Sequence, residues 1–430
     1  MLYQDGWPSY FILGPETSWG VATAAIRTTV YEFIDSTLAG ASDPINTARF
    51  RGNPSPTRQM LGKERAGGDL RLHLHAEDML IFLQHLMMDS AIASVDAVAQ
   101  EVYGDGAGAG KAYATPVTLD TQPTATSPAS DPGKLIVTFA GVQTGTVAIT
   151  GTDQNDTAIT ETLTFAGDTT KTTTYYFKSV DAAGVVLTGI TTGTLLITCD
   201  MNTWTHTIAL GDAVEAGVTI EEVKGAIPTT YLGCLFNSGT LDMGETVTLA
   251  LNIIANRANF RENIAGGASP TGIGAYSNMS EEIYPGWGMA LQLDAVQTGV
   301  ENCSLTINNN LSYRSRNKAV RQDGKPGRSD REIILTAGVD YDTTNANFDL
   351  TYESDQVIAA ILSGIHTPFA GPEYSITITM PRCQLQQHPD PPINDKADIL
   401  QTLSLRPIRS VADTSSDEIL IAVVSTETGV

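Results

Sequence analysis

The chain contains 430 residues with a net charge of −23, and 42% of its residues are hydrophobic. This length leaves room for two to four domains, and the composition excludes wholesale disorder. No apolar run approaches the roughly 20 residues of a membrane-spanning helix, and the N-terminus lacks the basic region and apolar core of a signal peptide. The four cysteines form no C-x-x-C pair, which indicates synthesis in a reducing cytoplasm.

The first segment, residues 1–102, combines a basic stretch with an apolar helical pattern. Residues 49–71 hold six basic residues against two acidic ones. Apolar residues at helical spacing follow this stretch and predict one short helix: Met79, Leu80, Leu83 and Met87.

Residues 104–133 are rich in Gly, Ala, Pro, Ser and Thr and show no apolar periodicity, which predicts a linker. Within them, GDGAGAGKA resembles a phosphate-binding loop. Asp105 stands where that motif requires its first glycine, however, and Ala112 stands where it requires a hydroxyl. We therefore expect a flexible segment and no nucleotide site.

Residues 134–200 contain short alternating segments such as KLIVTFAG and GTLLITCD, punctuated by Gly and Asp every eight to twelve residues. This regular spacing predicts a small β-sandwich of immunoglobulin-like type. The Cys…Trp…Cys set of antibody domains is absent, so the prediction concerns only the sandwich class.

The remaining chain repeats one order of elements: a basic segment, a strand, a short helix and a strand pair. In the second copy the basic segment is 314–331, and Cys383 takes the place that Cys234 has in the first. A second apolar stripe predicts a second short helix: Val357, Ile358, Ile361 and Leu362.

The sequence therefore predicts a mainly β protein made of two tandem β-rich domains, each with a short flanking helix. The first domain would be discontinuous, formed by residues 1–102 with 203–260, and the sandwich would be inserted into one of its loops. The second domain would span residues 283–430. The alternative of three unrelated domains leaves the matched order of elements unexplained.

The two basic segments stand out against an acidic chain. Together they hold 13 of the 25 basic residues and four acidic ones, a net charge of +9, so the rest of the chain carries −32. This distribution is typical of a subunit that binds other copies of itself, and head-to-tail contacts of this kind build filaments. Two alternatives stay open: solvated loops, and direct phosphate binding, which the missing aromatic residues and the acidic remainder disfavour.

With these segments assembled, the chain resembles the tail tube proteins of long-tailed bacteriophages. The resemblance lies in GPETSWGVAT (Gly14, Glu16, Thr17, Trp19, Gly20), in SLTINNNLSYRSRNK and in REIILTAGVDYD. It implies β-sandwich or barrel tube domains with a flanking helix, six of which close a ring around a lumen. A duplicated subunit would then need three copies for each ring.

The resemblance also implies partners and contact residues. The family's long loop reaches from one ring to the next, and the basic segments match it in position. The implied inter-ring residues are Arg58, Lys63, Arg65, Arg316, Arg321, Lys325 and Arg328. The implied partners are further copies of the chain, a tape measure protein, and tail-terminator and tail-tip proteins. Viral DNA would pass an acidic lumen without specific binding.

We expect no enzyme, cofactor or metal site. His73 and His75 alternate on a strand without a third ligand nearby, and the acidic pairs Glu221–Glu222 and Glu281–Glu282 are expected to be solvated or to pair with the basic segments. The alternative function is a host-surface carbohydrate-binding protein, in which the sandwich would use Tyr175 and Tyr176.

Overall fold

The computed structural model divides the chain into two compact units. The first unit comprises residues 1–92, 208–364 and 377–421, and the second comprises residues 93–207, 365–376 and 422–430. The residues that the structure describes are 9–21, 29–46, 59–89, 92–96, 100–106, 109–123, 133–153, 156–191, 193–200, 203–211, 216–225, 227–264, 277–278, 283–294, 296–314, 324–340, 357–366, 374–387, 400–409 and 418–425.

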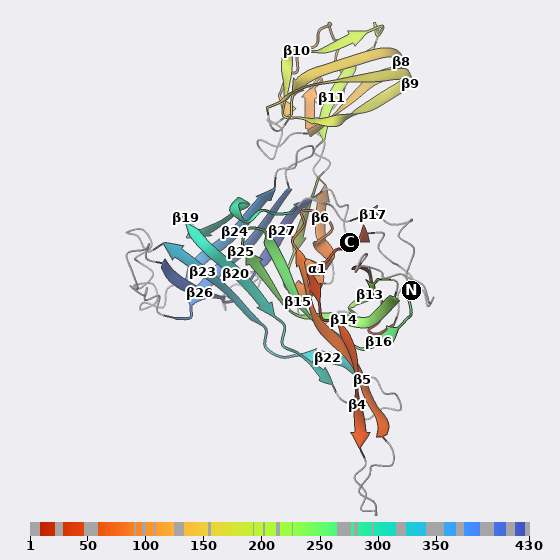
Figure 1. Ribbon diagram of the computed structural model, residues 1–430. Helices are drawn as coiled ribbons and strands as arrows, with labels where there is room; N and C mark the ends of the chain where they lie inside the picture. The colour runs from red at the N-terminus through yellow and green to blue at the C-terminus, as the bar shows by residue number, and fades with distance from the viewer. Residues whose placement is uncertain are drawn as a thin grey trace, which may run out of the picture. The chain divides into compact units, whose positions relative to one another are not determined.

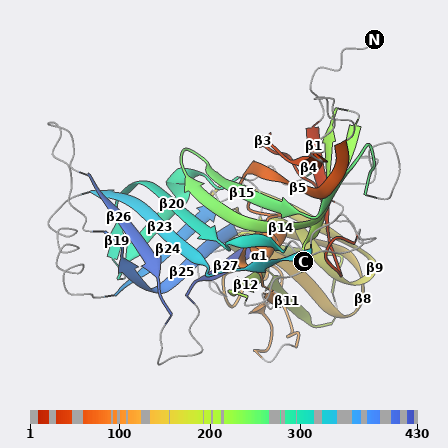
Figure 2. The same cartoon turned by 90° about the horizontal axis from the view of Figure 1, so that it is seen from below.

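The first unit is built on an antiparallel sheet whose strands follow one another across its width (Figures 1 and 2). In spatial order they are β5 (Gln59–His73), β15 (Val247–Ala255), β14 (Ile227–Met243), β20 (Val300–Asn308), β23 (Glu332–Asp340) and β26 (Leu400–Pro407). Leu249, Leu251 and Ile253 alternate with more polar residues along β15 and are buried. This period of two places one apolar face of the sheet against the core.

Strand β14 belongs to two groups of strands. Its second half lies between β15 and β20, and its first half pairs with β13 (Val218–Lys224) and β16 (Arg257–Phe260). Strand β13 in turn pairs with β1 (Ser9–Pro15). The remaining strands outside the second unit's sheet are β2 (Thr29–Val30), β3 (Asp35–Ser36), β4 (Ala39–Asn46), β6 (Ala93–Asp96), β12 (Trp204–Ile208), β17 (Ser277–Asn278), β18 (Met289–Leu293), β19 (Val296–Thr298), β21 (Leu311–Arg314), β22 (Gly324–Arg328), β24 (Ile358–His366), β25 (Tyr374–Leu385) and β27 (Leu420–Ser425).

The predicted first helix is confirmed as α1 (Leu80–Met87), the one α-helix among the described residues. It lies against β14, where the rings of Phe82 and Phe236 stack with centroids 6.0 Å apart. Phe82 also meets Tyr31 edge-on at 5.2 Å. Buried aromatic pairs of this kind contribute about 1 kcal/mol each beyond the area that they bury. They fix the helix on the apolar face of the sheet.

The predicted second helix is wrong, because residues 358–366 form strand β24, which pairs with β18. Ile358, Ala360 and Leu362 are buried on alternate positions of the strand. A short apolar run fits a helical spacing and a strand spacing equally well. Here the pairing with β18 decides the outcome.

The second unit contains a separate sheet of β7 (Gln100–Tyr103), β8 (Gly133–Thr152), β9 (Ala158–Phe177), β10 (Ser179–Thr188) and β11 (Leu195–Asp200). Strand β8 pairs with β9 along most of its length, while β11 and β10 pair with its first and second halves. Its core contains Val137, Phe139 and Phe165. The predicted short segments within 134–177 thus merge into two long strands.

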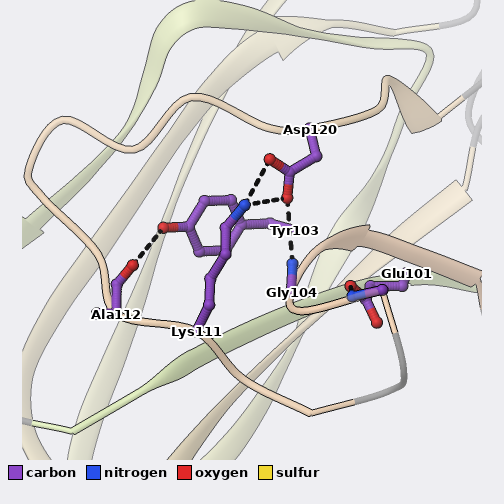
Figure 3. A network of polar contacts seen from close by, with 7 residues as sticks. Glu101, Tyr103, Gly104, Lys111, Ala112 and Asp120 are labelled. Carbon is purple, nitrogen blue, oxygen red and sulfur yellow. Dashed lines mark hydrogen bonds and ion pairs between the residues drawn. The ribbon is translucent and has the colours of Figure 1, made fainter.

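Part of the predicted linker packs against this sheet. Val117 and Leu119 are buried in its core, and Val117 bridges to Val185. The Lys111 ammonium group is held by the Asp120 carboxylate and lies 4.2 Å from the centre of the Tyr103 ring (Figure 3). Lys111, the lysine of the segment that resembles a phosphate-binding loop, therefore has structural partners and is bridged to Leu195 of β11.

The mainly β class that the sequence predicts is confirmed. Among the described residues, the structure has no helix of the length and apolar character needed to cross a bilayer.

Candidate assembly surfaces

Two hairpins carry the basic segments. The first arm consists of β4 and the first half of β5, paired from Ala39–Gly67 to Asn46–Gln59. The second arm consists of β21 and β22, paired from Leu311–Arg328 to Arg314–Gly324. Figure 1 shows β4, β5 and β22 at the same end of the first unit.

The structure describes four of the seven predicted contact residues. Lys63 and Arg65 lie on the first arm, and Lys325 and Arg328 lie on the second. Lys325 is exposed and the other three are partly exposed. Three further predicted residues, Arg58, Arg316 and Arg321, lie outside the described residues.

Tyr313 joins the two arms at their base. Its hydroxyl lies 2.7 Å from the carbonyl oxygen of Ala66 and 3.1 Å from that of Ala255, and donates a hydrogen bond to them. The Arg65 guanidinium lies over its ring, 5.0 Å from the centroid. Two basic segments that lie far apart in the sequence are thereby held side by side. Sequence analysis did not single out Tyr313.

Replacing Tyr313 by phenylalanine is expected to lower the free energy of unfolding by about 1 kcal/mol, since the ring stays and one hydrogen bond is lost. Urea denaturation followed by intrinsic fluorescence measures this change. Tyr175→Phe is the control, because Tyr175 is 51% exposed on the second unit's sheet. An equal loss in both variants would contradict the role of the Tyr313 hydroxyl.

Asn309 anchors the base of the second arm, which begins two residues later at Leu311. Its side chain is fully buried and donates to the carbonyl oxygens of Leu86, at the end of α1, and Phe236, on β14. Its amide oxygen accepts a hydrogen bond of 2.7 Å from Arg331, which also donates to Gly211. The Asn309 amide thus links α1, strand β14 and Arg331, which follows the second arm.

Arg328 also donates to the carbonyl oxygen of Gly211, at 2.9 Å. This predicted contact residue therefore has at least one hydrogen bond within its own chain. The structure does not test its contact with another copy, which stays a prediction.

The other face of the central sheet is lined by small polar side chains. Register places these residues in three rows across the strands: Asp69, Asn252, Ser238, Asn308 and Glu332; Arg71, Ala250, Thr240, Thr306 and Ile334; His73, Thr248, Asp242, Ser304, Thr336 and Ser404. We call these rows the polar face. Thr240 and Thr306 approach to 3.1 Å between hydroxyls, and Asn252 donates to Asp69 at 2.7 Å. Three acidic residues and one arginine give the polar face a weakly negative charge.

The GPETSWG segment forms a tight contact with β13 and β14. Glu16 is buried, and its carboxylate accepts hydrogen bonds of 2.7 Å from the backbone N–H groups of Gly20 and Gly233 and from the Thr219 hydroxyl. Burial raises the pKa of this carboxyl group above its ordinary value, against the opposing effect of these bonds. Trp19 donates to the Gly233 carbonyl at 2.9 Å, and Gly233 has φ +65°, so a Cβ atom there would be strained and would lie 2.7 Å from the indole nitrogen.

The predicted solvation of Glu221 and Glu222 is wrong, since the two residues are 0% and 2% exposed. Glu221 accepts from the backbone N–H of Ile264. Glu222 accepts from the Tyr231 hydroxyl and pairs with Lys224 at 3.0 Å. Both faces of β13 are covered, so adjacent residues are buried together. Glu281 and Glu282 lie outside the described residues.

The described residues contain no group of three His, Cys, Asp or Glu side chains placed to hold a metal ion. The four cysteines are buried. Burial raises the pKa of the Cys303 and Cys383 thiols to about 12, so thiolate nucleophiles are disfavoured there.

Residues 201–407 match a protein family described as phage tail tube protein. The matched region is slightly less than half of the chain and contains β12 to β26, with the second arm and most of the polar face. No curated protein matches the chain. The family match supports a tail tube protein, a structural component of a virion tail.

Proposed function

We propose that the protein is a tail tube subunit that assembles with copies of itself into stacked rings, and that the lumen of these rings conducts viral DNA into the host bacterium. The family match over residues 201–407 is the observation that carries this proposal. An enzymatic role finds no support in the described residues, where the buried carboxylates of Glu16, Glu221 and Glu222 accept hydrogen bonds from structural groups.

A repeated pairing order supports the duplication. In the first half of the chain, β3 pairs with β5, β5 with β15, and β15 with β14. In the second half, β20 pairs with β23, β23 with β26, and β26 with β25. Along the chain, the first arm follows β3 and continues into β5, and the second arm lies between β20 and β23. The proposed tube domains are residues 1–102 with 203–260, and residues 283–430.

The two cysteines that sequence analysis matched also agree in detail. The Cys234 thiol donates to the carbonyl oxygen of Tyr231 at 3.6 Å, and the Cys383 thiol donates to that of Met380 at 3.8 Å. Both acceptors lie three residues before the cysteine. This shared local geometry favours two copies of one ancestral domain.

The seam between the halves supports a ring of three subunits. Strand β14 of the first half pairs with β20 of the second, so that the two halves share one continuous sheet. If a neighbouring chain repeats this seam, three duplicated subunits close a ring of six similar domains. The polar face is the proposed lumen wall, because hydroxyl and amide groups with a weak negative charge offer a polyanion no binding site.

The basic arms are the proposed contacts between rings, with Lys63, Arg65, Lys325 and Arg328 as their described basic residues and Arg58, Arg316 and Arg321 as further candidates. The resemblance to tail tube proteins supports a tape measure protein and tail-terminator and tail-tip proteins as further partners. Virion assembly in the host cytoplasm fits this role.

Negative-stain electron microscopy of the purified protein at high concentration tests the proposal. Hollow tubes of stacked rings, with three subunits per ring by mass measurement, are the expected result. Single particles at both low and high salt, also after addition of tail-tip or tape measure proteins, would contradict it.

A deletion separates the tube function from a binding function of the second unit. Asp96 and Trp204 are paired across β6 and β12, so a short Asn-Gly turn can replace residues 97–203. We expect the shortened chain still to form tubes. Loss of a host-surface binding activity with this deletion, without any tube formation by the full chain, would favour the carbohydrate-binding alternative.

A further inference from the structure

The central sheet has a second end, opposite the two arms. In the β5–β15 pair, Ala255 lies opposite Ala66 at the arm end, and Thr248 lies opposite His73 near the other end. The nine residues from Val247 to Ala255 span about 26 Å of extended strand. We call this far end, with the β14–β15 turn and the short helix η3 (Gly286–Gly288), the rim.

Trp287 projects from the rim and is 88% exposed. Its support is rigid: Gly286 donates to the Glu245 carbonyl at 3.0 Å, and Thr246 forms a bridge with Pro285. A Cβ atom on Gly286 would collide with the backbone oxygen of Gly244, so only glycine permits this approach. A large, exposed aromatic side chain on a fixed backbone segment is typical of an interface anchor.

A groove of about 230 Å³ lies beside Trp287. Its apolar wall includes Met289, Leu291 and Leu362. An exposed tryptophan next to a groove with polar and apolar walls can accept both the planar or charged group and the aliphatic stem of an arginine or lysine side chain.

The rim is also acidic. Asp242, Glu245 and Glu301 are exposed there, and Glu301 lines the groove. The sequence contains no Lys or Arg between Arg261 and Arg314. The rim therefore complements the arms of the same chain in charge, and the two surfaces lie at opposite ends of one sheet.

We propose that the rim of one copy receives a basic arm of a second copy, with Trp287 and Glu301 as the receiving residues. This inference rests on the proposed tube function and names the receiving site for its ring-to-ring contact. Complementary surfaces at opposite ends of a subunit give a head-to-tail contact, which stacks without closing. An arginine of the arm stacks on the Trp287 indole while carboxylates of the rim pair with neighbouring basic groups.

A labelled peptide of residues 311–331 tests the site without requiring tubes. Its binding to the full chain is measured by fluorescence anisotropy at low salt, with a peptide carrying glutamine at every basic position as control. We expect Trp287→Ala and Glu301→Lys to weaken binding at least tenfold. Tyr175→Ala and Asp181→Lys are matched controls, since both residues are exposed on the second unit's sheet, and should bind like the wild type.

Microscopy of the same variants provides the second readout. We expect Trp287→Ala and Glu301→Lys to retain rings but to shorten stacks at least tenfold. Equal peptide binding by all variants, no binding to the wild type, or wild-type stacks from both rim variants would overturn the receiving site. Absence of tubes from the wild type would instead count against the tube function, and the peptide measurement would still decide on the rim.

Discussion

The Asn309→Ala variant is expected to lose about 3–5 kcal/mol of unfolding free energy. This is the largest loss that we expect from substituting a single polar side chain of the first unit. The amide is fully buried and satisfies the carbonyl groups of Leu86 and Phe236 and the guanidinium of Arg331. Its removal takes one hydrogen-bond partner from each of these three groups and opens a cavity beneath the second arm. Urea denaturation monitored by circular dichroism measures the loss.

Asn308→Ala is the matched control, because that neighbouring side chain lies partly exposed on the polar face and accepts a hydrogen bond from Asn310. Its expected loss is within about 1 kcal/mol. Asn309→Asp should cost at least as much as Asn309→Ala, since a buried carboxylate would face two carbonyl oxygens. A loss below about 1 kcal/mol for both Asn309 variants would show that the second arm has another anchor.

Substitution of Glu16 is expected to have the next largest effect, a loss of about 2–4 kcal/mol for Glu16→Ala. The variant leaves two backbone N–H groups and the Thr219 hydroxyl without their acceptor. Glu16→Gln should lose less, because one oxygen still accepts from Thr219 and Gly233 while an amide NH₂ faces the N–H of Gly20. Thr17→Ala is the control, since Thr17 is exposed in the same turn.

The stability difference between the wild type and Glu16→Gln should depend on pH. The folded pKa of Glu16 is raised above the ordinary value of 4.5 by burial, so the protonated form favours the fold. The stabilising contribution is fully present below pH 4.5 and is lost as the pH rises through the folded pKa. The wild-type advantage should therefore grow as the pH falls through this window, in denaturation measured between pH 8 and 4. A constant difference across that range would contradict the raised pKa.

Local sequence patterns predicted correctly the elements in which the buried residues follow a single spacing, either that of a helix or that of a strand. The stripe of Met79, Leu80, Leu83 and Met87 continues across two helical turns, and all four residues are buried. The run at residues 357–362 contains apolar residues at both spacings, and pairing with β18 selects the strand. A single sequence does not contain that pairing, since the partner lies about 70 residues away.

Long-range contacts account for the remaining differences. Charge alone indicated the two arms, but Tyr313 joins them through backbone oxygens of residues that show no local pattern. Val117 and Leu119 belong to the hydrophobic core of the second unit although their surroundings have the composition of a linker. Glu221 and Glu222 are buried because both faces of β13 are covered, which strand alternation alone does not reveal.

The buried thiols have a chemical consequence for the lifetime of the protein. With pKa values of about 12, Cys303 and Cys383 would be ionised in roughly one molecule in 10⁵ at pH 7. Oxidation and disulfide exchange proceed through the thiolate. A folded chain with these thiols resists oxygen, peroxide and stray disulfides for as long as its core stays closed. All four cysteines are free and buried, so this resistance comes from burial in the core and not from a disulfide.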